Sequence, residues 1–175
     1  MTQQFFLFDM DGVLLKPRGY HQSLQASVHR IGAALGAPNT ELSENQIARF
    51  EALDVTNEWD SLAISTALIL IHLWEFDPDI RLDGISPNRE IITESKPDFD
   101  QFLRDFSYQS ELPGRSAYHF LLKKHAWLSR EQQTHLFTIL HFCRDIFKSP
   151  TLPGHQETVL GSQVFTENYN LSSQL

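Results

Sequence analysis

The sequence predicts a mostly α-helical chain that begins with one buried β-strand. Residues 5–15 form a short apolar run, interrupted by two aspartates and a glycine, and apolar runs of this length are typical of buried parallel strands. From residue 18 to about residue 148, apolar side chains recur at helical spacing in about six stretches separated by proline, glycine and polar turns. Residues 151–175 are only weakly patterned. We therefore expect one strand, a helical bundle and a short return segment.

The first three helices are predicted from apolar periodicity and from end signals. The first should stop at Gly36, because Pro38 follows it closely. Its apolar face is formed by Leu24, Val28, Ile31 and Leu35. Ser43 to Gln46 is a capping-box sequence that should open the second helix. The run from Trp59 to Trp74 is apolar nearly all round, so we expect a third helix at the centre of the bundle, with both tryptophans anchoring the core.

Three more helices are predicted after a long irregular connection over residues 76–96. Pro97 should open the fourth helix, and the fifth should follow Pro113. Ser129 to Gln132 is a second capping-box sequence, which should open a sixth helix ending near Lys148. The three apolar faces are Phe99, Phe102, Leu103 and Phe106; Tyr118, Leu121, Leu122 and His125; and Leu136, Leu140, Cys143 and Phe147.

The composition is that of a folded domain, and it disfavours two classes of partner. Of 175 residues, 41% are hydrophobic and 21% charged, and the formal net charge of -8 disfavours nucleic acid and anionic membrane surfaces. Cys143 is the only cysteine and the chain start lacks signal-peptide features, so we expect a cytoplasmic protein. The strongest apolar run, Leu62 to Trp74, is shorter than the roughly 20 residues that cross a bilayer.

Two aspartates one residue apart, Asp9 and Asp11, end the predicted strand and are followed by Gly12. Ligands of open α/β sheets bind beyond the carboxyl ends of such strands. Two carboxylates in one turn repel each other unless a cation compensates them, and Mg²⁺ prefers such oxygen ligands. One aspartate could then attack an electrophilic phosphorus atom, while the other transfers a proton.

This run resembles the first motif of the haloacid dehalogenase superfamily of hydrolases, hhhhDxDG(V/T)hh, where h is an apolar residue. The resemblance implies that Asp9 is the nucleophile that forms an aspartyl-phosphate and a ligand of Mg²⁺. It implies that Asp11 is the general acid/base and offers its backbone carbonyl to the same ion. Dehalogenases proper lack the second aspartate, so Asp11 favours phosphoryl transfer. Gly12, Lys16 and Arg18 follow directly and are candidate substrate-binding residues; for the two cations a solvated hinge is the alternative.

The resemblance also implies an architecture. Members of the superfamily have an α/β core of Rossmann-like topology, and many insert an α-helical cap directly after the first motif. Residues 1–17 would then be the first strand and motif of the core, residues 18–150 the cap and residues 151–175 a return segment to the core. Such a cap would close over the site, exclude water and select the substrate.

Three further motifs of complete members are not found in this sequence. They are a Ser or Thr that ends a second strand, a lysine that steadies the phosphoryl group and an acidic pair that completes the magnesium site. Ser162 and Lys148 lack the surrounding residues that these motifs require. We therefore expect an incomplete protein of low or no activity alone, which lacks half of its core or obtains it from a protein partner.

Simpler interpretations of the same residues stay open. Asp9 and Asp11 could end a strand in an ordinary polar turn; an EF-hand calcium loop does not fit, because its glycine is the sixth residue and Gly12 would be the fourth. The eight histidines form no i, i+4 pair, so we expect them to be satisfied in the core or at the surface. Cys143 is expected to pack in the core, and Lys123 and Lys124 to be solvated.

The function predicted from these observations is that of a magnesium-dependent phosphatase acting on a small phosphorylated metabolite. Whether the chain alone is an enzyme is left open. One alternative is a non-catalytic helical module that retains the first motif and acts through protein contacts. A further alternative is a phosphomutase, which would share both aspartates.

Overall fold

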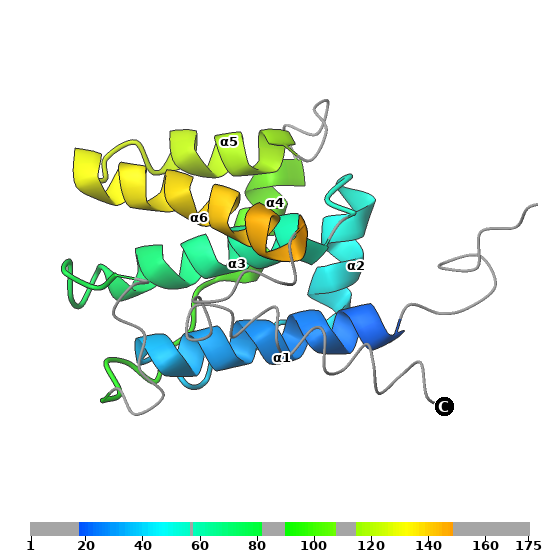
Figure 1. Cartoon of the computed structure of the whole chain (residues 1–175), viewed down its shortest axis with the longest axis horizontal. Coiled ribbons are helices and arrows are strands. Elements are labelled where there is room, and N and C mark those ends of the chain that lie inside the picture. The colour runs from blue at the N-terminus through cyan, green and yellow to red at the C-terminus, as the bar shows by residue number, and fades with distance from the viewer. Residues whose placement is uncertain (1–17, 57, 82–89, 108–114, 149–175) are drawn as a thin grey trace, which may run out of the picture.

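The computed structural model describes residues 18–56, 58–81, 90–107 and 115–148. Within these ranges the chain forms helices and no strand (Figure 1). The helices are α1 (Arg18–Leu35), α2 (Glu44–Ala52), α3 (Glu58–Leu73), α4 (Phe99–Ser107), α5 (Arg115–Lys124) and α6 (Arg130–Lys148). The expectation of a mostly helical chain is thus confirmed for the described ranges. The predicted strand at 5–15 and the return segment at 151–175 lie outside them.

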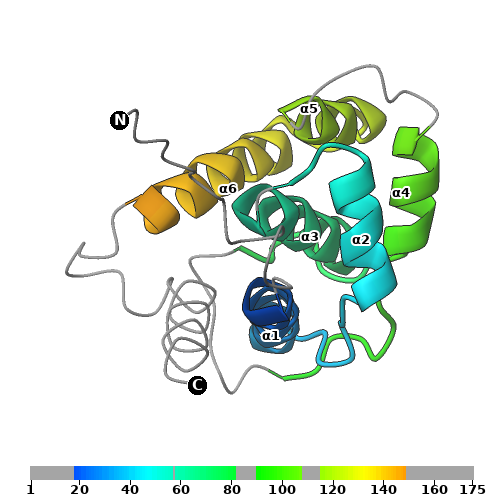
Figure 2. The same ribbon diagram turned by 90° about the vertical axis from the view of Figure 1, so that its right-hand side faces the viewer.

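Helix α3 lies at the centre of the bundle, as its nearly uniform apolarity predicts. It packs against α1, α5 and α6, and every residue from Asp60 to Ile71 is buried. Figure 2, which looks along the bundle, shows the other helices arranged around it. A helix that is hydrophobic all round must be covered on all sides, and this requirement sets the architecture. None of the described helices has the combination of length and apolarity needed to cross a bilayer.

The predicted stop of α1 at Gly36 is confirmed, and it is a Schellman turn. The Gly36 N–H donates to Ala33 O at 3.1 Å, and the Ala37 N–H donates to Gly32 O at 2.8 Å. Gly36 has φ +98°, in the left-handed region that glycine adopts without strain. Its own carbonyl accepts from the N–H groups of Ile92 and Thr93, at 2.8 and 3.2 Å. The end of α1 therefore also fixes the segment that precedes α4.

Both predicted capping boxes are present. Ser43 Oγ accepts from the Gln46 N–H at 3.3 Å, and Gln46 Oε1 accepts from the Ser43 N–H at 2.9 Å. Ser129 and Gln132 make the same reciprocal pair at 3.2 and 3.1 Å. Each box satisfies two backbone donors that a helix start would otherwise leave unpaired, so the starts of α2 and α6 are set by local sequence.

Aromatic side chains fill the space between α2, α4 and α5. The rings of Phe102 and Phe106 stack with centroids 6.1 Å apart, and Phe106 meets Phe120 at 5.5 Å. Phe50 of α2 reaches Phe102 at 6.5 Å. At the far end of α3, the buried Trp74 donates its indole N–H to Ile80 O at 3.0 Å, which confirms its predicted role as an anchor. The side chain of Trp59 lies outside the described set.

Candidate functional site

The residues predicted to carry the chemistry fall almost entirely outside the described ranges. Asp9, Asp11, Gly12 and Lys16 precede residue 18, so their predicted roles as nucleophile, acid/base, magnesium ligands and substrate contacts stay predictions. Arg18 is the first residue of α1. The structure therefore describes the helical body that begins directly after the acidic motif, and the first helix is the element through which that body is connected to the motif.

One side of α1 carries three polar residues at helical spacing, His21, Gln25 and His29, which we call the α1 polar stripe. Gln25 Nε2 donates to Leu42 O at 2.9 Å, and His29 Nδ1 lies 3.3 Å from Thr40 O. Because a carbonyl can only accept, the Nδ1 atom of His29 must carry the proton in this contact. The stripe thus holds α1 against the segment that leads into α2.

His21, at the start of the stripe, lies between two carboxylates of α2. Its Nδ1 atom is 2.9 Å from Glu44 Oε2, and its Nε2 atom is 2.9 Å from Glu51 Oε1. The imidazole is 17% exposed, whereas Glu44 and Glu51 are 64% and 44% exposed. Burial lowers the pKa of His21, but the hydrogen bonds and charges of Glu51 and Glu44 outweigh it, and the net effect raises the pKa above the ordinary value.

The contacts of His21 were not predicted from the sequence. His21 and His29 are eight positions apart with Gln25 between them, so they do not form the i, i+4 pair that is typical of helical metal sites. A polar stripe at i, i+4 and i+8 beside the apolar face of the same helix is the signal that could have indicated a polar helix contact. The partners on α2 could not be identified from spacing, because they belong to another element.

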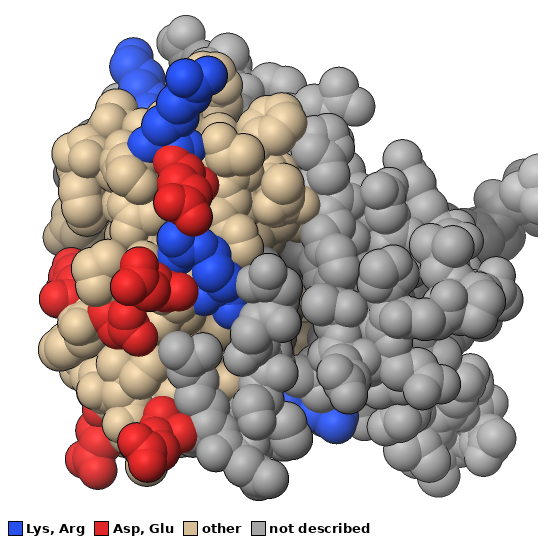
Figure 3. Space-filling view, turned by 60° about the vertical axis from the view of Figure 1, so that its left-hand side comes forward, with Lys and Arg blue, Asp and Glu red and all other residues tan. Residues whose placement is uncertain are grey.

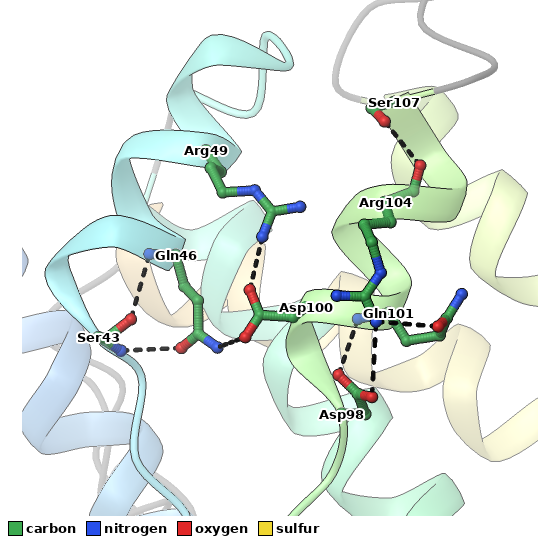
Figure 4. A network of polar contacts seen from close by, with 8 residues as sticks. All are labelled: Ser43, Gln46, Arg49, Asp98, Asp100, Gln101, Arg104 and Ser107. Atoms are coloured by element: carbon green, nitrogen blue, oxygen red, sulfur yellow. Dashed lines mark hydrogen bonds and ion pairs between the residues drawn. The ribbon is translucent and has the colours of Figure 1, made fainter.

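A second polar network joins α2 to α4 (Figure 4). Asp100 of α4 accepts from Gln46 Nε2 at 3.0 Å with one oxygen and from Arg49 Nη1 at 2.5 Å with the other. Gln46 is also the second residue of the α2 capping box, so one side chain both starts α2 and binds α4. Close by, Asp98 accepts from the Gln101 N–H at 2.8 Å, as an N-terminal cap of α4 would.

Other charged side chains form ion pairs on the surface. Lys124 donates to Asp105, and this hydrogen bond is the main reason that the pKa of Asp105 is lowered. Arg81 donates to Glu131 at 2.8 Å and lowers the pKa of that exposed carboxyl. On the face seen in Figure 3, acidic and basic side chains are interspersed rather than gathered into one patch. Lys123 and Lys124 are exposed, as predicted.

A serine and a histidine meet beside the end of α3. His72 Nε2 lies 2.9 Å from Ser95 Oγ, which lies 2.7 Å from Thr93 Oγ1. Glu75 Oε2 is 3.8 Å from His72 Nδ1, too far to orient the ring by a hydrogen bond. These groups resemble parts of a nucleophile and its base. The contact between His72 and Ser95 attaches the 90–98 segment to α3. His72 thus has a hydrogen-bond partner, as expected from the sequence.

His125 lies directly after α5. Its Nδ1 atom lies 2.9 Å from Leu121 O. Burial lowers the pKa of His125, and the nearby charge of Lys124 acts in the same direction, although the hydrogen bond to Leu121 opposes them. His125 therefore has a hydrogen-bond partner, as expected from the sequence, and its environment favours the neutral form, whereas the environment of His21 favours the charged form.

Among the described residues no group of three or more His, Cys, Asp or Glu side chains is arranged to hold a metal ion. The predicted magnesium ligands lie outside those residues, so this finding does not bear on them. The chain matches no known family model, no curated protein and no solved structure.

Proposed function

We propose that the chain carries the first motif and the helical cap of a magnesium-dependent phosphatase of the haloacid dehalogenase type, acting on a small phosphorylated metabolite in the cytoplasm. Asp9 attacks the phosphorus atom and forms an aspartyl-phosphate, which water then hydrolyses. Asp11 donates a proton to the leaving oxygen and later accepts one from the attacking water. Mg²⁺ held by the two acids would neutralise charge on the transferring phosphoryl group.

The observation that carries this proposal is the succession of an acidic motif and a helical body. Residues 5–15 match the motif, and α1 begins at Arg18, seven positions after Asp11. A chain of that length spans at most about 25 Å, so the start of α1 must lie within that distance of Asp11. A helical body attached so closely to the acids fits a cap that excludes water from the reaction.

Residues that follow the acids, up to the first residue of α1, have a role in the same proposal. Gly12 allows the backbone to turn beside the acids, and Lys16 and Arg18 supply positive charge for a phosphate group. The net charge of -8 makes such local positive charge useful, because the molecule as a whole repels anions.

The test is phosphate release from p-nitrophenyl phosphate by the full chain, with and without Mg²⁺. We expect slow, magnesium-dependent release that is lost in Asp9→Asn and in Asp11→Asn, because the first variant lacks the nucleophile and the second the proton donor. The matched control is Asp54→Asn, an exposed aspartate with φ +60°, a conformation that asparagine also adopts readily. Its rate should equal that of the wild type.

Two results would contradict the proposal in different ways. Equal rates in Asp9→Asn and the wild type would overturn the assignment of the nucleophile. No release by any variant, together with no magnesium binding in calorimetry, would overturn the phosphatase function of this chain and favour the non-catalytic helical module. Transfer of the phosphoryl group to a sugar phosphate rather than to water would favour the phosphomutase.

A further inference from the structure

We propose that His21 is a proton-operated latch, which holds the first turns of α1 against α2 when its imidazole is protonated and releases them when the proton leaves. The latch is a different device from the phosphatase site, and it stands whether or not Asp9 is a nucleophile. It rests on the position of one ring between two carboxylates.

The geometry requires the charged form of the ring. Nδ1 faces Glu44 and Nε2 faces Glu51, each at 2.9 Å. Carboxylate oxygens can only accept hydrogen bonds, so both ring nitrogens must be donors, and only imidazolium has two N–H groups. In neutral imidazole one nitrogen carries a lone pair, which would face a carboxylate and be repelled. Loss of the proton therefore removes one hydrogen bond and weakens the other, which is no longer charge-assisted.

The two carboxylates reach His21 from two turns of the same helix. Glu44 is the first residue of α2 and Glu51 is the last but one, so the two are about 10 Å apart along the helix. A ring that bridges them fixes both the position and the direction of α1 relative to α2. In the described part of the chain, Glu44 and Glu51 are the charged groups that act on His21.

The direction of the pH effect follows from the pKa. The pKa of His21 is raised in the folded chain above its ordinary value of 6.5. The contacts of His21 therefore stabilise the folded state fully below pH 6.5, and this contribution disappears as the pH rises through the raised pKa. Release thus occurs at a higher pH than it would for a histidine with the ordinary pKa.

The effect of the latch is confined to one end of α1. Gln25 and His29 contact the backbone carbonyls of Leu42 and Thr40. The amide of Gln25 does not titrate, so its hydrogen bond persists when His21 loses its proton. At the other end, the Schellman turn at Gly36 closes the helix. Deprotonation of His21 should therefore loosen only the first turns of α1, which receive the chain from the motif residues.

The first measurement is an NMR titration of the Cε1–H signal of His21, assigned by its absence in His21→Gln. We expect Glu51→Gln and Glu44→Gln each to lower the pKa of His21. The matched control is Glu41→Gln, which removes an exposed carboxylate just before α2 and should leave that pKa unchanged. The same pKa for His21 in all four proteins would overturn the latch.

The second measurement is amide hydrogen exchange across the pH range of that titration, corrected for intrinsic exchange rates. Protection of residues 22–25 should fall about three- to tenfold as His21 loses its proton, a change expected for a half-exposed charged hydrogen bond. Protection near Leu35 should stay constant. In His21→Gln, the pH-dependent fall in protection of residues 22–25 should not occur. An equal loss of protection at both ends of α1, or no loss at residues 22–25, would contradict a local latch.

Discussion

At the scale of single residues, Gly36 combines two roles that a side chain would prevent. Its φ of +98° closes the Schellman turn, and its carbonyl accepts two backbone hydrogen bonds from Ile92 and Thr93. A Cβ atom placed on Gly36 would lie 2.9 Å from both Glu90 O and Ile92 Cγ1. The position therefore requires glycine for conformation and for space at once.

We predict that Gly36→Ala lowers the free energy of unfolding by at least about 2 kcal/mol, because the left-handed conformation and the crowding at Glu90 and Ile92 both oppose the methyl group. Urea unfolding followed by circular dichroism measures the change. Asp54, at φ +60°, provides the reverse substitution: Asp54→Gly should be neutral or stabilising. A loss below about 0.5 kcal/mol in Gly36→Ala would show that the segment at Ile92 can move away.

The surroundings of some histidines could be predicted from the sequence, and those of His21 could not. The sequence indicated that His72 and His125 would be satisfied within apolar surroundings, and both have partners, Ser95 and Leu121. The environment of His21 depends on Glu44 and Glu51, which follow it by 23 and 30 positions. Local periodicity describes one helix at a time, so it cannot identify a partner that only packing brings near.

At the scale of elements, the two capping boxes have the same local chemistry in different surroundings. Gln132 makes the reciprocal cap contact with Ser129, at the start of α6. Gln46 makes the same contact with Ser43 and in addition donates to Asp100 of α4. Gln132 therefore contributes a cap contact alone, whereas Gln46 contributes a cap contact and a hydrogen bond between two helices.

We predict that Gln132→Ala lowers the free energy of unfolding by about 0.5–1 kcal/mol, the value of a cap contact. Gln46→Ala should cost about 0.5–1.5 kcal/mol more, because it also removes the hydrogen bond to Asp100. Thermal or urea unfolding of the two variants gives the difference. Equal losses of unfolding free energy in the two variants would mean that the hydrogen bond from Gln46 to Asp100 adds no stability and that Arg49 alone holds Asp100. The double variant of Gln46→Ala and Arg49→Ala would then measure the contribution of the contact between α2 and α4.

The helices themselves were well predicted, because their ends are encoded by neighbouring residues. Both capping boxes, the stop at Gly36 and the start after Pro97 depend on side chains within a few positions of the helix end. The contacts between helices, such as Asp100 with Gln46 and Arg49, follow from how apolar faces pack and could not be assigned from spacing. The magnesium site was predicted from a motif alone, and its residues precede the described ranges.

At the scale of the whole molecule, stability is concentrated on α3. Its side chains are shared with α1, α5 and α6, so a defect there affects several interfaces at once. Leu70, in the last turn of this helix, is fully buried, whereas Ile91 in the connection before α4 is 62% exposed. The two aliphatic residues allow the contribution of the central core to be measured against a surface position in the same chain.

We predict that Leu70→Ala lowers the free energy of unfolding by about 2–5 kcal/mol, because it leaves a cavity that the surrounding helices cannot fill. Ile91→Ala should change it by less than about 0.5 kcal/mol. Denaturant unfolding monitored by tryptophan fluorescence and by circular dichroism gives both values. A loss below about 1 kcal/mol for Leu70→Ala would contradict a tightly packed centre at α3.

The backbone contacts at Gly36 also determine the topology of the chain. Hydrogen bonds from Ile92 and Thr93 to Gly36, and from Asn39 to Glu94, 55 positions apart, close the intervening chain into a ring that contains α2 and α3. If the backbone were cut inside this ring, the two pieces would still be joined by the hydrogen bonds at Gly36 and Asn39.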